Sequence, residues 1–252
     1  MYRLVLGICL LLGWLAAPAL AEPRLALVIG IADYRSLGVD DRAEAGVADA
    51  KLMAGTLEQL GFSVQLAVDV DQKKMNTALR DFATALAAAG PDATGVFYFS
   101  GSGAAISGEQ FLIPREASIQ DARDLDLEAM SLGTVTRLLE FSGCQTKIVI
   151  LETDRFNPFD RSDPPAITLS KSGPLGVGFF LAYATSEGEL RPEPQTANHP
   201  FTSALARVML ESNIDIITML QLARREVVAA TNNTQVPTDT STLLTTYFFR
   251  TD

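Results

Sequence analysis

The chain has 252 residues, of which 48% are hydrophobic and 20% are charged, with 18 Gly, 12 Pro and two Cys. These fractions are those of an ordinary globular protein, and they exclude a disordered chain, a collagen-like repeat and a disulfide-rich scaffold. The formal net charge of −10 repels phosphate backbones, so we expect no nucleic-acid partner.

The first 21 residues have the layout of a secretory signal peptide. Arg3 precedes an apolar run over residues 4–15, and the segment ends on Ala19-Leu20-Ala21. The alternative, an uncleaved anchor, is disfavoured because the run is shorter than the roughly 20 residues that span a bilayer. We therefore predict cleavage before Glu22, a periplasmic or secreted protein, and no membrane attachment after cleavage.

Apolar runs of strand length alternate with segments of helical periodicity along residues 22–252. Strands are predicted at 24–30, 62–70, 95–101, 147–151, 177–185 and, as a terminal edge strand, 245–250. Helices are predicted at 47–60, 74–89, 131–141, 201–211 and 214–230. This alternation is typical of βαβ units and predicts an α/β fold whose parallel sheet is covered on both faces. Because ligands bind beyond the carboxyl ends of such strands, residues 99–103 and 151–155 are the candidate site segments.

Nine motifs carry a resemblance to a known family through their order and spacing. They read RLALVIGIADYRSLG, DAKLMAGTLEQLGFSV, FYFSGSG, FLIP, LDLEAMSLGTVTRLLE, KIVILETDRFNPF, FFLAYATSEGE, HPFTSALARVML and NNTQVP. Together they resemble the caspase-like cysteine peptidases, which include metacaspases and bacterial paracaspase-like proteins. The resemblance implies a three-layer α/β/α sandwich with a mostly parallel six-stranded sheet. It divides the domain into a large-subunit-like part (22–160), a linker (161–176) and a small-subunit-like part (177–252).

The resemblance also locates the positions of the catalytic dyad. Active members carry a His in F-S-G-H-G and a Cys in L-D-A-C-R, and the imidazole takes the thiol proton before the thiolate attacks. Here Ser102 stands at the His position and Asp154 at the Cys position. We expect Asp154 to accept hydrogen bonds from Ser102 and from loop N–H groups. A carboxylate pair of Glu152 and Asp154, as in aspartic peptidases, is the alternative.

Part of a substrate cleft is expected to survive. Glu152 retains the charge of the family acid that holds a basic substrate side chain, two residues before the Cys position. Asp33 and Tyr34 in the opening turn, with Tyr183 and Thr185 after the fifth strand, are expected to line the same groove. Such a groove could bind a basic or extended peptide without cutting it. The alternative is that these side chains only pack and cap loops.

No other residue is expected to carry chemistry. His199, the only histidine, is predicted to be a surface loop residue, and Cys144 a small buried thiol. No Cys/His cluster has the spacing of zinc ligands, so no metal or cofactor is expected. The acidic residues of segment 67–71 could touch calcium, as in some metacaspases, but we predict a solvated turn.

The leading hypothesis is an exported, catalytically inactive caspase-like domain that binds a protein or peptide ligand in its cleft. The first alternative is a hydrolase that uses another constellation, with Cys144 or His199 brought in by the fold. The second is a structural subunit that forms a homodimer through its terminal edge strand at 245–250.

Overall fold

A computed structural model describes residues 22–34, 44–159, 175–192 and 194–252 of the chain. The predicted signal peptide and nearly all of the predicted linker lie outside the described residues. In the part of the chain that is described, no helix combines the length and the apolar character needed to cross a membrane.

The centre of the molecule is a six-stranded sheet in the order β2-β1-β3-β7-β8-β9. Its strands are β1 (Arg24–Gly30), β2 (Ser63–Val68), β3 (Thr94–Ser100), β7 (Thr146–Glu152), β8 (Phe179–Tyr183) and β9 (Thr238–Ser241). Every pairing is parallel except that of β8 with β9. The mostly parallel six-stranded sheet predicted from the sequence is confirmed.

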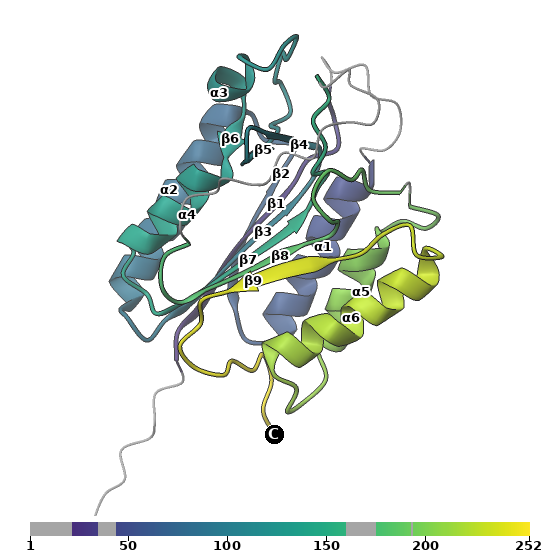
Figure 1. Ribbon diagram of the computed structural model, residues 1–252. Coiled ribbons are helices and arrows are strands. Elements are labelled where there is room, and N and C mark those ends of the chain that lie inside the picture. The colour runs from purple at the N-terminus through teal and green to yellow at the C-terminus, as the bar shows by residue number, and fades with distance from the viewer. Residues whose placement is uncertain (1–21, 35–43, 160–174, 193) are drawn as a thin grey trace, which may run out of the picture.

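Helices cover both faces of this sheet (Figure 1). One layer contains α1 (Glu44–Gln59), α5 (Pro200–Val208) and α6 (Ile216–Ala230), and the other contains α2 (Gln72–Ala89), α3 (Leu125–Glu128) and α4 (Leu132–Phe141). Successive side chains of a strand point to opposite faces, so β3 sends Phe97 and Phe99 into one core and Val96 and Tyr98 into the other. The three-layer α/β/α sandwich is thereby confirmed.

A small antiparallel sheet beyond β3 was not predicted. It consists of β4 (Gly103–Ile106), β5 (Glu109–Leu112) and β6 (Met130–Ser131). A two-residue turn joins β4 to β5, with Ser107 and Gly108 at φ of 51° and 83°. Both positive φ values are those that a tight hairpin turn requires. Strands of two to four residues are too short to leave a periodic pattern in the sequence.

The predicted terminal strand at 245–250 is wrong. The edge strand is β9, seven positions earlier, and segment 245–250 makes only an isolated bridge between Phe248 and Asp215. Its alternating aromatic side chains turn inward instead, because Tyr247 and Phe249 are buried and stack edge to face at 5.1 Å. The alternation of apolar residues in this segment therefore predicted correctly that the side chains are buried, and wrongly that the segment pairs as a strand.

The carboxyl ends of β1, β3 and β7 meet at one edge of the sheet. The Ile31 amide donates to the Ser100 carbonyl (2.9 Å), and the Gly101 amide donates to the Glu152 carbonyl (3.2 Å). Helix α1 begins directly over this edge, where a Cβ at Gly46 would overlap the carbonyl oxygen of Ile31. These close backbone contacts fix the loops that follow the strands.

Candidate functional site

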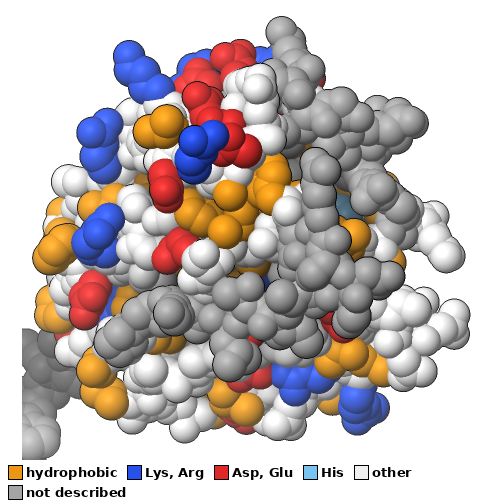
Figure 2. All heavy atoms as spheres, turned by 45° about the horizontal axis from the view of Figure 1, so that its top comes forward, with side chains coloured by type: hydrophobic (Ala, Val, Ile, Leu, Met, Phe, Trp, Pro, Cys, Tyr) orange, Lys and Arg blue, Asp and Glu red, His pale blue; other side chains and the backbone are white. Residues whose placement is uncertain are grey.

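A cavity of about 290 Å³ opens at the carboxyl ends of the strands. The polar side chains among its described lining residues are those of Tyr34, Ser102, Asp154, Arg191 and His199. Its apolar lining consists of Ile31, Ala104, Ile113, Ile119, Leu125, Phe156, Pro158, Phe159, Leu190 and Pro192. Hydrophobic side chains are also visible in the middle of this face of the molecule (Figure 2). The two dyad-equivalent positions, Ser102 and Asp154, thus line one cavity.

Ser102 follows β3 and is held by its backbone. Its amide donates to the hydroxyl oxygen of Tyr34 at 2.7 Å, and that hydroxyl donates to the Ile113 carbonyl at 3.3 Å. Burial raises the pKa of Tyr34, so the phenol stays protonated. Among the described residues, no hydrogen bond joins the Ser102 hydroxyl to Asp154 or to His199. Within the described part of the chain, the Ser102 hydroxyl is therefore not hydrogen-bonded to a base.

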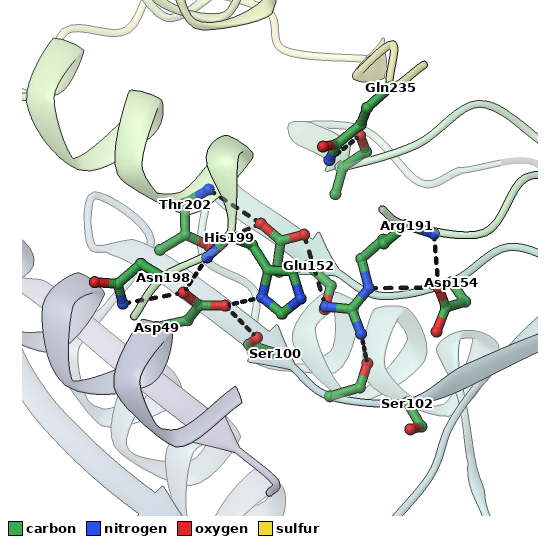
Figure 3. Close-up of polar contacts among 12 residues, drawn as sticks. Asp49, Ser100, Ser102, Glu152, Asp154, Arg191, Asn198, His199, Thr202 and Gln235 are labelled. Carbon is green, nitrogen blue, oxygen red and sulfur yellow. Dashed lines mark hydrogen bonds and ion pairs between the residues drawn. The ribbon is translucent and has the colours of Figure 1, made fainter. Parts of the chain in front are cut away.

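Arg191, in the loop after β8, was not predicted to take part in the site. Its Nη1 donates to the Glu152 carbonyl (2.8 Å) and its Nη2 to the Gly101 carbonyl (3.0 Å). Its backbone amide donates to Asp154 Oδ1 at 2.8 Å. Only 8% of its side chain is exposed. Figure 3 shows the guanidinium reaching between Glu152 and Asp154, so that one side chain ties the ends of β3 and β7 together.

The carboxylates of Glu152 and Asp154 both lie next to the guanidinium of Arg191, and they do not share a proton with each other. Arg191 Nη1 lies 3.7 Å from Glu152 Oε1, and Arg191 Nε lies 3.5 Å from Asp154 Oδ1. This arrangement contradicts the carboxylate pair considered from the sequence. Of the hydrogen bonds expected for Asp154, the one from a loop N–H is confirmed, because the Arg191 amide donates to it. The one from Ser102 is wrong, because no described hydrogen bond joins the two side chains.

Glu152 lies behind the cavity and does not line it. Its carboxyl group is fully buried, and its Oε2 accepts from the Thr202 amide (3.0 Å) and the Thr202 hydroxyl (2.9 Å). Burial raises the pKa of Glu152, and the neighbouring charges of His199 and Arg191 oppose that rise. The position expected to hold a ligand's basic side chain is therefore already in contact with the chain's own Arg191.

His199 is not the surface residue that the sequence suggested. It is 3% exposed, and its Nδ1 lies 2.6 Å from Oδ2 of Asp49 in α1. Asp49 also accepts from the His199 amide (3.0 Å), the Ser100 hydroxyl (2.9 Å) and the Asn198 side chain (3.1 Å). The run VADAKLMA contains two charged residues, Asp49 and the exposed Lys51, so no local signal in the sequence singled out the buried one.

The other predicted cleft residues are distributed differently. Asp33 is paired with Arg115, whose Nε lies 2.9 Å from Asp33 Oδ2. Tyr183 and Thr185 are buried, at 5% and 0% exposure, and Arg155 lies 3.9 Å from the centre of the Tyr183 ring. Burial raises the pKa of Tyr183 to about 12. Of the five cleft candidates, only Tyr34 is among the described lining residues.

The acidic segment 67–71 has a structural role. Asp69 Oδ1 accepts from the amides of Ala32 (2.7 Å) and Asp33 (3.0 Å), and Asp71 caps α2 by accepting from the Lys74 amide (2.8 Å). Within the described residues, no group of three or more His, Cys, Asp or Glu side chains could hold a metal ion. Cys144 is a buried free thiol that precedes β7, at the end of the strand opposite the site.

The three-layer sandwich and its mostly parallel six-stranded sheet are those of a caspase-like fold. A family model described as the caspase domain matches residues 23–249, and the chain belongs to this family. The fold is similar to the crystal structure of caspase-1 from Spodoptera frugiperda, with a TM-score of 0.69 and 18% identity. That match covers 91% of this chain and 90% of the other, and at this identity it shows the fold alone. A comparison with curated proteins gives no match.

Proposed function

We propose that this caspase-family chain is an exported, catalytically inactive domain that binds a protein or peptide partner in the cavity beyond β3 and β7. The observation that carries the proposal is the position of Arg191. Its guanidinium lies between Glu152 and Asp154 and hydrogen-bonds the carbonyl of Gly101, next to Ser102. Asp154, at the position of the family nucleophile, is thus paired with the chain's own Arg191 beside the open cavity.

Catalysis by a side-chain nucleophile relies on a base that activates it, and the described residues hold no such pair in hydrogen-bond contact. No described base is hydrogen-bonded to Ser102, and the Cys144 thiol lies at the other end of the sheet. Asp154 is held by Arg191 through both an ion pair and a backbone amide. Binding without turnover is what such a site can perform.

The test is a peptidase assay of the purified chain with fluorogenic peptides cut after Arg, Lys or Asp, with and without calcium. We expect no turnover above that of a buffer blank. Turnover that disappears in both Ser102→Ala and Asp154→Ala would overturn the proposal. Ser203→Ala, on α5 and away from the cavity, is the matched control for expression and handling.

One observation favours a second candidate function, a hydrolase with an unusual base. Asp49 orients the His199 ring, as the third member of a catalytic triad does, and His199 lines the same cavity as Ser102. This candidate predicts turnover that is lost in His199→Gln and kept in Asp154→Ala. The same substrates and the same assay therefore separate the two functions.

A further inference from the structure

We infer that the cavity selects its peptide by one bulky apolar side chain, and not by a basic one. The inference rests on the proposed function, because it names the kind of peptide that the same cavity takes. It departs from what the charge of Glu152 suggested, and three features of the described residues support it.

First, the acids around the cavity already have partners within the chain. Asp49 receives four hydrogen bonds, two of them from His199. Glu152 is bonded to Thr202 and lies beside Arg191, and Asp154 is paired with Arg191. A lysine or arginine from a ligand would have to displace a buried guanidinium that makes two hydrogen bonds to backbone carbonyls. Among the described residues, each of these three acids is thus already paired with a group of the chain itself.

Second, the cavity wall is apolar. Ile31 and Ala104 are fully buried at its base, and Ile113 is 6% exposed. Phe156 and Leu190 stand nearer the rim, where half of the Leu190 side chain, 49%, is exposed. The volume of about 290 Å³ is at the lower limit of ligand pockets, which begin at roughly 300 Å³, and suits one large side chain better than a cofactor.

Third, a polar residue able to bind a peptide backbone lines the cavity beside its apolar wall. Arg191 Nε is buried against Asp154, 3.5 Å away, and is not accessible to a ligand. Ser102 is among the described lining residues, and its hydroxyl can donate a hydrogen bond. A peptide carbonyl beside Ser102 would accept from this hydroxyl while the adjoining side chain enters the apolar part. The arrangement thus fits an amphipathic ligand with an extended backbone.

The experiment measures fluorescence anisotropy with five fluorescein-labelled hexapeptides that differ only at one central residue: Leu, Phe, Arg, Lys or Asp. We expect the Leu and Phe peptides to bind at least about tenfold more tightly than the Arg and Lys peptides, the factor that burial of one apolar side chain supplies. Equal or tighter binding of the basic peptides overturns the inference and leaves the proposed function standing. Binding of none of the five peptides contradicts both.

Variants of strand β4 show whether the cavity itself is the binding site. Ala104→Leu fills the cavity, whereas Ala105→Leu adds the same atoms to the next residue of β4, which is not among the described lining residues. We expect about a tenfold loss of Leu-peptide binding in Ala104→Leu and none in Ala105→Leu. Leu190→Glu, at the half-exposed rim, gives the same loss without disturbing the buried base. Unchanged binding in both cavity variants would overturn the inference.

Discussion

Arg191 lies among two carboxylates and two backbone carbonyl groups, and almost none of its side chain reaches solvent. Removing one partner of a buried ion pair leaves the other charge uncompensated. Arg191→Met is therefore expected to lower the free energy of unfolding by about 3 kcal/mol, as measured by urea denaturation. The matched variant Arg137→Met, on the exposed side of α4, should change it by less than about 0.5 kcal/mol. Equal losses in the two variants would contradict this role for Arg191.

Glu152 gives the stability of the protein a pH dependence of known sign. Burial raises its pKa above the ordinary value of 4.5, so the folded protein holds this proton more tightly than the unfolded chain. The protonated Glu152 carboxyl therefore contributes to the free energy of unfolding. This contribution is complete below pH 4.5 and is lost as the pH rises through the raised pKa of Glu152.

Glu152→Gln removes that loss, because the amide does not ionise. As the pH rises above about 4.5, the free energy of unfolding of the variant should improve relative to the parent chain, by at most about 1.4 kcal/mol per pH unit. Urea denaturation at intervals from about pH 4 to about pH 8 would measure this difference. This range covers the titration of a carboxyl group whose pKa is raised. A difference that stays constant would show that folding leaves the pKa of this carboxyl unchanged, and one that moves in the opposite direction would show that its charged form is stabilised. Either result would contradict the raised pKa.

Residues of the site differed in how far the sequence could predict them. Ser102 and Asp154 follow buried strands directly, so the rule for strand ends placed both at the cavity. Asp49 and His199 are 150 positions apart, and no local pattern connects them. Arg191 belongs to a loop without periodicity, and its role depends on carbonyl groups of other strands. Long-range polar contacts of this kind become visible only in the folded chain.

At the scale of elements, periodicity predicted what is long and buried. The helix predicted at 74–89 is observed as α2 at Gln72–Ala89, and the strand predicted at 147–151 as β7 at Thr146–Glu152. The short strands β4, β5 and β6 were missed, and so was β9, whose polar sequence TDTS has no apolar alternation. These strands are held by backbone pairing to neighbours, which leaves little trace in local sequence.

Helix α1 contains two glycines in opposite environments, and they provide a test of how closely the helix approaches β1. A Cβ at Gly46 would overlap the backbone of Ile31, whereas a Cβ at Gly55 would meet no atom within 4 Å. Gly46→Ala should therefore lower the free energy of unfolding by about 2 kcal/mol through overpacking. Gly55→Ala should raise it by about 0.5–1 kcal/mol, because alanine favours a helix. Thermal and urea unfolding of the pair would measure both signs, and a loss in Gly55→Ala would contradict the packing described for α1.

At the scale of the whole molecule, the C-terminal segment closes the core at the end of the sheet opposite the site. Arg24 Nη1, at the start of β1, donates to the carbonyls of Phe249 (2.6 Å) and Leu60 (3.1 Å). The Phe249 ring lies 6.2 Å from that of Phe62. Segment 245–250 is thus engaged within its own chain. The homodimer considered from the sequence would have to use another edge, such as the outer side of β9.

That arrangement predicts a change in stability without a change in oligomeric state. Phe249 is 3% exposed, whereas Leu244, the residue before segment 245–250, is 81% exposed, so the two apolar residues form a matched pair. Phe249→Ala should lower the free energy of unfolding by about 3 kcal/mol, and Leu244→Ala by less than about 0.5 kcal/mol. Both variants should elute from a size-exclusion column at the volume of the parent chain. A side chain that packs only within its own subunit stabilises that subunit and leaves the association between subunits unchanged. If Phe249→Ala instead shifted a dimer to a monomer with little loss of stability, the segment would be an interface.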